Sequence, residues 1–382
     1  MSQLNEQSVA DRISGLEAEI ADKKIKLPPD IFKYVEEHIS SVNRILEGGR
    51  MPTEKDMEFM EHVRMWLSLD EVDRERFTNM ESFLGFKEVQ ESKKRQISLS
   101  QYLACVEVLE HLGFSSEDLS KGDARIFQFP GNGRVATARS LRLSDYSGAL
   151  PDNFEVMGAL DLSKFQGKHL PKNLTVNHEL ILDDSPNLKE IPDDLTLGLN
   201  SSLQAMHCDS LERISGKISV GQGLSVGSCP KLVTIGEGLR VANAFDASNC
   251  TSLKKLPADF LVGRELCLYG CKALEEIPDN VNGPAFARYI SLQNCVNLKK
   301  LPSSLETHKL NLFSCTSLKR LPDHLNVDIL NLKGCDSLEC LPEDMKVDQT
   351  FLHSINLSSK EQLKKDLDRV KKSGKVKGIS YS

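Results

Sequence analysis

The spacing of hydrophobic residues changes near residue 126. Before this point they recur every three or four positions among charged residues, the spacing of amphipathic helices; the first group is Val9, Ile13, Leu16 and Ile20. After it, leucines alternate over short L-x-L units and then recur at wider, regular intervals. This change predicts an α-helical bundle or cap over residues 1–122 and a different architecture over residues 123–357.

The last predicted helix of the first region has clear end signals. Ser98 and Ser100 can cap its N-terminus, its apolar positions include Leu103 and Leu109, and Gly113 follows its end. A short segment further on, Gly131-Asn132-Gly133-Arg134, lacks the lysine and hydroxyl residue of a phosphate-binding loop. We therefore expect it to be a turn.

The second region repeats itself. Four stretches that begin at Leu266, Ile290, Leu310 and Leu330 share the pattern L-x-L-x-x-C-x-x-L-x-x-L-P, with isoleucine in place of some leucines. The cysteine position, here called the slot, is filled in ten copies, and its seven cysteines are separated by 21, 21, 21, 24, 20 and 20 residues. The slot residues are Tyr146, Phe165, Ser185, Cys208, Cys229, Cys250, Cys271, Cys295, Cys315 and Cys335.

This repeat predicts a solenoid. The two leucines of L-x-L point inward from a short strand, and the slot residue lies where the chain must turn inside the core. The Leu/Ile-Pro pair then returns the chain along the other side, where we expect no sheet hydrogen bonds. Because one copy cannot bury its leucines alone, neighbouring copies must stack into a continuous parallel sheet.

The pattern resembles the short bacterial leucine-rich repeats with an "LP" signature, over about residues 138–357. The resemblance implies an α/β solenoid, a leucine-rich-repeat horseshoe with a concave parallel sheet behind an N-terminal helical region. Such repeats occur in effectors that pathogens inject into host cells, and similar wording occurs in the longer repeats of plant resistance receptors. One effector branch carries a ubiquitin-ligase domain after the repeats, for which the roughly 25 residues after Leu357 leave no room.

The third segment, residues 358–382, predicts a capping helix and a basic tail. The helix carries Leu363, Leu367 and Val370 on one face, and we expect it to cover the open end of the core. The lysines that follow could touch nucleic acid or acidic lipid, but a solvated face is favoured.

Composition narrows the function classes. The formal net charge of −7 and a pI of about 5.8 argue against nucleic-acid binding, and no apolar run is long enough to span a membrane. The N-terminus lacks the pattern of a Sec signal peptide. Buried thiols indicate a reducing compartment, so we expect a cytoplasmic protein, in the bacterial cytosol or in a host cytosol after non-Sec secretion.

No catalytic, cofactor or metal site is predicted. Stacked slot cysteines lie within disulfide range of one another, but none has the C-x-x-C spacing of a zinc site, and parallel thiols inside a dry core are favoured. No histidine recurs beside a cysteine and an acid. A glycine-rich stretch, residues 216–238, lacks the Leu-Pro pair and is either a softer joint or two degenerate repeats.

The outward residues of the last four repeats form the candidate binding surface, because strand alternation exposes them while it buries the leucines. Aromatic residues with a polar surround are typical of protein-binding hot spots. The alternative is that the aromatic rings merely cover one another. The predicted partner-binding residues are Glu265, Tyr269, Tyr289, Gln293, Lys309, Asn311, Phe313, Asn331 and Lys333.

Three hypotheses for function follow. The first is a module that binds another protein on the concave face, in a secreted bacterial effector. The second assigns an unrecognised catalytic or regulatory activity to the N-terminal helices, which the repeats would target. The third is a scaffold that stays inside the bacterium, and export assays would separate it from the first. The oligomeric state is not readable from the sequence.

Overall fold

The computed structural model describes residues 97–114, 126–279, 288–351, 361–373 and 379–380, together with Ser14, Gly15, Ala18, Ile39 and Ser40. The chain divides into two compact units, residues 1–134 and 135–382, each taken by itself below. Apart from the five isolated positions, the helices that the sequence predicts before residue 97 lie outside the described residues.

In the first unit, helix α6 (Leu99–His111) confirms the last predicted helix. Ser98 is its N-cap and forms a capping box with Gln101, in which each side chain bonds the other residue's backbone. Gly113 follows the helix with a φ of 81°. Strand β1 (Gln128–Gly131) precedes Asn132 and Gly133, whose φ values of 54° and 66° confirm the predicted turn.

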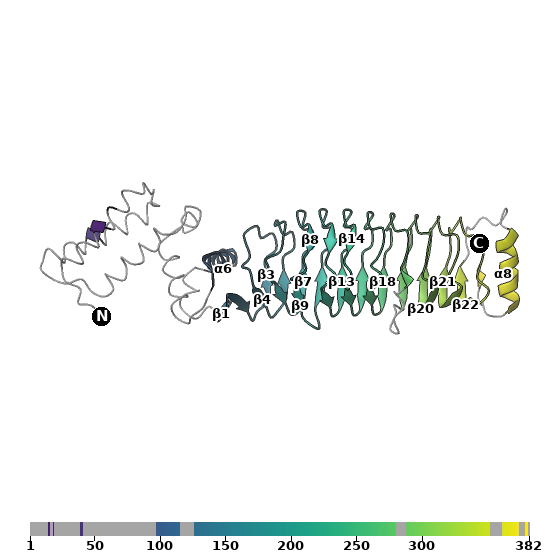
Figure 1. Ribbon diagram of the computed structural model, residues 1–382, viewed down its shortest axis with the longest axis horizontal. Coiled ribbons are helices and arrows are strands. Elements are labelled where there is room, and N and C mark those ends of the chain that lie inside the picture. Colours follow the sequence, from purple (N-terminus) through teal and green to yellow (C-terminus); the bar gives the residue numbers. More distant parts are fainter. Residues whose placement is uncertain are drawn as a thin grey trace. The chain divides into compact units, whose positions relative to one another are not determined.

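The second unit is a parallel β-solenoid of about ten turns with a repeat of about 21 residues (Figure 1). Leu203 pairs with Leu224, and Leu224 with Phe245, so each step advances the chain by 21 residues. The predicted solenoid is confirmed at this level, whereas no horseshoe curvature is shown. In Figure 1 the turns follow one another in a straight row.

Twelve strands form the sheet that runs the length of the solenoid, here called the long sheet. Its strands are β3 (Leu141–Arg142), β5 (Leu160–Asp161), β7 (Glu179–Ile181), β10 (Ser202–Gln204), β13 (Gly223–Ser225), β16 (Ala244–Asp246), β18 (Glu265–Cys267), β19 (Tyr289–Ser291), β20 (Ser304–Asn311), β21 (His324–Asn331), β22 (Lys346–Phe351) and β23 (Ile379–Ser380).

The other sides of the turns also carry strands. The return side, which follows the slot, has a three-stranded sheet of β8 (Glu190–Ile191), β11 (Arg213–Ile214) and β14 (Thr234–Ile235). A further side has two runs of parallel strands, β2 (Arg134–Thr137), β4 (Phe154–Val156), β6 (Thr175–Val176) and β9 (Thr196–Leu197), then β12 (Ser219–Val220), β15 (Arg240–Val241) and β17 (Leu261–Val262).

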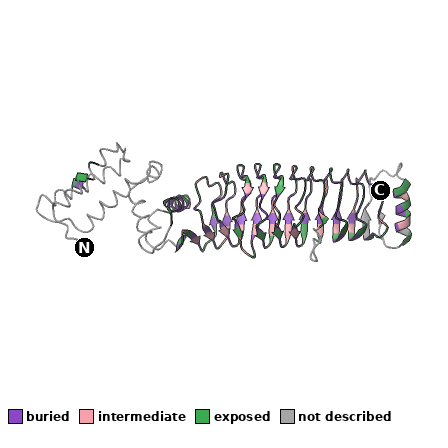
Figure 2. Ribbon diagram, in the orientation of Figure 1, coloured by how far each residue is buried: buried purple, intermediate pink, exposed green. Residues whose placement is uncertain are grey.

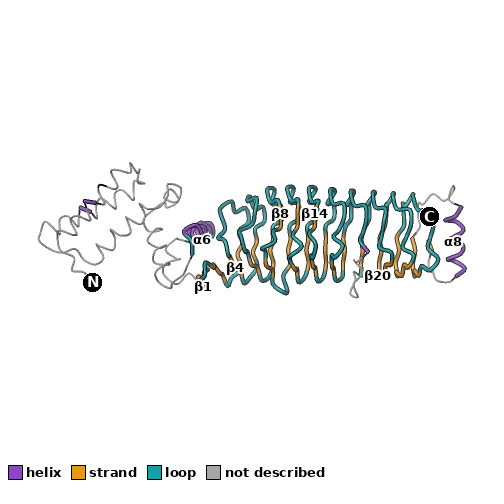
Figure 3. The backbone as a smooth tube through the Cα atoms, in the orientation of Figure 1, coloured by secondary structure: helices purple, strands orange, loops and turns teal. Residues whose placement is uncertain are grey.

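The return side corrects one expectation, because its segments do make sheet hydrogen bonds. Ser215 and Gly236 stand where other repeats have the proline, and their amides donate to the carbonyls of Ile191 and Ile214 at 2.9 and 2.8 Å. A proline such as Pro257 has no N–H to donate. The solenoid contains little helix: its described residues include one α-helix, α8 (Glu361–Ser373) (Figure 3).

The core is built as the leucine pattern predicts. In the long sheet the middle residue of each three-residue strand is buried and its two neighbours are more exposed (Figure 2). Leu266 and Leu268 of one L-x-L unit are fully buried. At the C-terminal end, α8 buries Leu363 and Leu367 and its Asp366 carboxylate accepts the Leu341 N–H at 3.0 Å, which confirms the predicted cap.

Candidate functional site

The seven slot cysteines are fully buried free thiols, as predicted. Each donates its S–H to a backbone carbonyl of the preceding turn; the Cys271 Sγ, for example, lies 3.1 Å from the Ala247 oxygen. Burial raises the pKa of the Cys295 thiol to about 12, so it stays protonated at neutral pH. The thiols therefore join neighbouring turns through these contacts. The other six contacts span 3.0–3.2 Å and start from Cys208, Cys229, Cys250, Cys295, Cys315 and Cys335.

A column of left-handed residues stands directly before the slots. Its ten members have φ values of 55–75°, a conformation that glycine, asparagine and aspartate adopt at least cost. The recurring small or polar residue before each cysteine signals this turn, and our sequence analysis did not use it. The members are Asp145, Lys164, Asp184, His207, Ser228, Asn249, Gly270, Asn294, Ser314 and Gly334.

The predicted binding residues lie in three rows across strands β18–β21. Register places Glu265, Tyr289 and Lys309 side by side in the first row. The second row contains Cys267, Ser291, Asn311 and Asn331, and the third contains Tyr269, Gln293, Phe313 and Lys333. Tyr269 is the most open aromatic of the set, with 40% of its surface exposed.

Two side chains of the second row form hydrogen bonds that stabilise the backbone, which the sequence pattern did not predict. The Asn311 carboxamide oxygen accepts the Phe313 N–H at 3.2 Å, and that of Asn331 accepts the Lys333 N–H at 3.1 Å. These side chains fix the turn at the end of each strand. Asn311 is also only 9% exposed, so the expectation that strand alternation exposes this residue is wrong. The two candidates that are exposed rather than half-buried, Glu265 and Tyr269, belong to the first and third rows.

Two lysines cover aromatic rings from the next strand. The Lys309 Nζ lies 5.2 Å from the centre of the Tyr289 ring, and the Lys333 Nζ lies 5.9 Å from that of Phe313. Both distances are within the range of cation–π attraction. The rings of Tyr289 and Phe313 are thus partly covered within the sheet, and the lysines present their charge beside them.

Two arginines that the sequence analysis missed border the first row. Arg264 and Arg288 are exposed and directly precede Glu265 and Tyr289. They lie in successive turns of the solenoid, and the backbones of these turns are hydrogen-bonded: the Tyr289 amide donates to the Arg264 carbonyl at 3.1 Å. Strand alternation did not find them because they lie at the corner where the chain enters the sheet.

We call these seven residues the basic aromatic strip: Arg264, Arg288, Lys309, Lys333, Tyr269, Tyr289 and Phe313. None of the four cations forms an ion pair with any residue that the structure describes. Glu265 is the exposed carboxylate within the first row. The strip therefore offers uncompensated positive charge beside aromatic surface.

The second row also contains a cysteine, Cys267. Cys267 is half-buried, and burial, with the carboxylates of Asp246 and Glu265, raises the pKa of its thiol to about 11. Its thiol is therefore protonated at neutral pH. In the described part of the chain, no cluster of histidine, cysteine, aspartate and glutamate has the form of a metal site.

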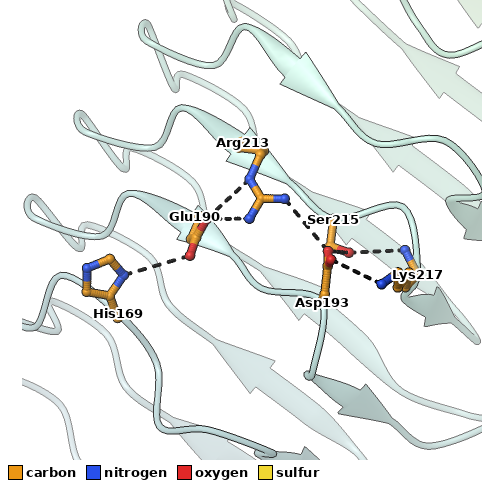
Figure 4. A network of polar contacts seen from close by, with 6 residues as sticks. All are labelled: His169, Glu190, Asp193, Arg213, Ser215 and Lys217. Atoms are coloured by element: carbon orange, nitrogen blue, oxygen red, sulfur yellow. Dashed lines mark hydrogen bonds and ion pairs between the residues drawn. The ribbon is translucent and has the colours of Figure 1, made fainter.

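The return side carries a network of charged residues (Figure 4). The Arg213 Nε lies 3.2 Å from the Glu190 carboxylate, and its guanidinium also reaches Asp193 at 3.7 Å. The Ser215 hydroxyl donates to Asp193, and the Lys217 ammonium lies 3.4 Å from it. Because the charges satisfy one another across turns, this network is a clamp between repeats rather than a ligand site.

This clamp predicts a pH dependence of stability. The Ser215 hydrogen bond, aided by Lys217 and Arg213 and opposed by desolvation, lowers the pKa of Asp193 below its ordinary value. A carboxyl whose pKa is lowered by folding stabilises the fold above its unfolded pKa, about 3.9, and loses this effect as the pH falls through the folded value. Urea unfolding from pH 2 to 7 should therefore show Asp193→Asn less stable than the parent above pH 5, with the difference vanishing at the acid end.

Asp209→Asn is the matched control, because the exposed Asp209 carboxylate bonds no residue in the described ranges. Its stability should follow that of the parent at every pH. A difference between Asp193→Asn and the parent that stays constant down to pH 2 would contradict the assignment.

A polar groove of about 380 Å³ crosses the starts of β20 and β21 and the turn before β22. It brings together Ser304, His324 and Asp344, which occupy equivalent positions at intervals of 20 residues. The sequence analysis overlooked this series. The His324 imidazole makes no hydrogen bond to any described residue.

Known proteins add no assignment to this picture. Neither the models of known protein families nor the curated proteins match the chain. None of the helices in the described ranges is long and apolar enough to cross a membrane.

Proposed function

We propose that the solenoid binds a partner protein on the outer face of the long sheet, through the basic aromatic strip. The observation that carries the proposal is the strip itself. It combines an aromatic ring that is 40% exposed, Tyr269, with four cations that are unpaired within the described residues. Aromatic and arginine side chains supply most of the binding energy in protein interfaces.

The fold supports this proposal because it brings the residues of the strip together on four adjacent strands and their ends. Parallel strands lie about 4.8 Å apart, so β18–β21 span about 14 Å. The carbonyl and amide groups of these strands are used within the sheet, for example between Tyr289 and Lys309. A partner must therefore read side chains and not an open strand edge.

Removing the exposed ring tests the proposal. We expect Tyr269→Ala to weaken capture of a specific partner about tenfold, because a central aromatic contact is lost. Immobilised full-length chain and its variants are exposed to lysate of candidate host cells, and the captured proteins are quantified by mass spectrometry. Partners identified in this way are then titrated as purified proteins.

Val233→Ala is the matched control, since Val233 is 48% exposed but lies on the return side. A specific partner is one that the parent and Val233→Ala capture equally. If Tyr269→Ala, Tyr289→Ala and Phe313→Ala all retain every such partner, the outer face of β18–β21 is not the binding surface.

The proposal also covers the cell in which the chain meets its partner. The L-x-L-x-x-C-x-x-L-x-x-L-P pattern resembles repeats of injected effectors, so we place the partner in a host cell and the chain there after export. This part rests on the resemblance alone. An export assay that finds the chain retained in the bacterium would replace it with the scaffold hypothesis.

A further inference from the structure

We infer that the basic aromatic strip recognises an acidic segment of its partner, a stretch of aspartate and glutamate residues that lies across strands β18–β21. The inference rests on the proposed function and adds the chemistry of the ligand. It is drawn from the charges around the strip, which differ in sign from those of the chain as a whole.

Charge complementarity is the first step. The chain has a formal net charge of −7, yet Arg264 and Arg288 directly precede β18 and β19, Lys309 lies in β20, and Lys333 lies in the turn after β21. Some cations elsewhere pair across turns, as Lys299 does with Glu275 at 3.2 Å and Lys319 with Glu339 at 3.3 Å. The strip's cations have no such partners among the described residues. A ligand with carboxylates would supply them.

The positions of the lysines are the second step. Each lysine leans over the ring of the preceding strand, so the ammonium groups of Lys309 and Lys333 are held beside Tyr289 and Phe313. This contact restricts their side chains before any ligand arrives, which lowers the entropy lost on binding. A carboxylate can then bond the ammonium while an adjacent apolar group packs on the ring.

The length of the strip sets the size of the segment. Three strand steps of about 4.8 Å give about 14 Å across the strands, and Lys333 lies five register positions beyond Arg264 along them, about 16 Å. An extended chain advances about 3.3 Å per residue, so about seven residues cover the diagonal of about 22 Å. Glu265 lies at one end of the strip and opposes an acidic ligand there.

A displayed library of random twelve-residue peptides tests the inference with the full-length chain as bait. We expect the captured peptides to be enriched in aspartate and glutamate. Lys309→Met with Lys333→Met keeps the apolar stems over the rings but removes both charges, and it should weaken binding of a captured peptide about tenfold. Lys309→Arg with Lys333→Arg should restore it, whereas Glu265→Gln should tighten it.

Lys254→Met with Lys255→Met removes two exposed charges from the return side and should leave binding unchanged. Captured peptides that need Tyr269 but are not acidic would overturn the inference and leave the proposed function standing. Capture that never depends on the strip also overturns it, while the experiment with folded partners still decides the proposed function. Binding of a single-stranded oligonucleotide through the same lysines, without acidic peptides, would assign the strip to nucleic acid instead.

Discussion

Replacing Gly216 with alanine should lower the free energy of unfolding of the solenoid by about 3 kcal/mol or more, because the substitution forces two turns apart. A Cβ at this position would lie 1.7 Å from the Glu237 carbonyl oxygen and 2.5 Å from the Gly236 carbonyl carbon. Both are backbone atoms of the next turn, and neither can rotate away. The φ of Gly216 lies outside the left-handed region, so the cost is steric.

Gly223→Ala is the control within the same repeat. Its nearest neighbour would be the Ala244 oxygen at 3.6 Å, an ordinary contact. The added methyl group also restricts the unfolded chain, so this variant should be unchanged or more stable by up to about 1 kcal/mol. Urea unfolding followed by circular dichroism measures both variants. Equal stability of the two would mean that the turns around Gly216 are loosely packed.

This pair of variants also decides how the glycine-rich stretch should be understood. The sequence of this stretch is compatible with a softer joint or with two degenerate repeats. The strands continue through it without a break, as β10 pairs with β13 and β13 with β16. The backbones at Gly216 and Glu237 approach each other closely, which favours two degenerate repeats. In these repeats the Leu-Pro pair is missing, and glycine allows the backbones of neighbouring turns to pack tightly.

The features that the sequence predicted correctly are those that a fixed period determines. Inward leucines such as Leu266 and slot residues such as Cys271 recur at each turn, so burial of one copy implies burial of all. Helix ends were also readable, because Ser98 caps α6 through contacts within four residues. The C-terminal cap followed from its apolar face and its place after the last repeat.

The features that the sequence did not predict depend on contacts between turns. The return strands arise because Ser215 and Gly236 can donate where proline cannot, and this requires the neighbouring turn to be in register. The curvature of the expected horseshoe is not shown, and the structure supports a parallel β-solenoid.

The candidate surface shows the same division. Alternation found Lys309, which lies in β20, but missed Arg264, which stands at the corner directly before β18. It also offered Asn311 as a contact residue, although that carboxamide bonds the Phe313 amide. A local hydrogen bond of this kind is invisible to periodicity, because asparagine can equally serve the solvent or the turn.

A last result expected of the slot is that Cys271→Ala lowers the free energy of unfolding by about 2 kcal/mol, whereas Cys271→Ser lowers it by only about 1 kcal/mol. Alanine loses the S–H bond to the Ala247 carbonyl and leaves a small cavity in a fully buried site. The serine hydroxyl is smaller than the cysteine thiol, but it keeps a hydrogen-bond donor. The slot already contains serine once, where the Ser185 hydroxyl accepts the Phe165 N–H at 3.1 Å.

The order of the two variants in urea unfolding separates two explanations of the cysteine column. If the thiols act mainly as small hydrophobic groups, serine is the worse replacement, because it buries a polar hydroxyl in their place. If they act as donors that join turns, alanine is worse. The near-constant distances of 3.0–3.2 Å between each sulfur and a carbonyl of the preceding turn favour the second explanation. Serine less stable than alanine at Cys271 would overturn it.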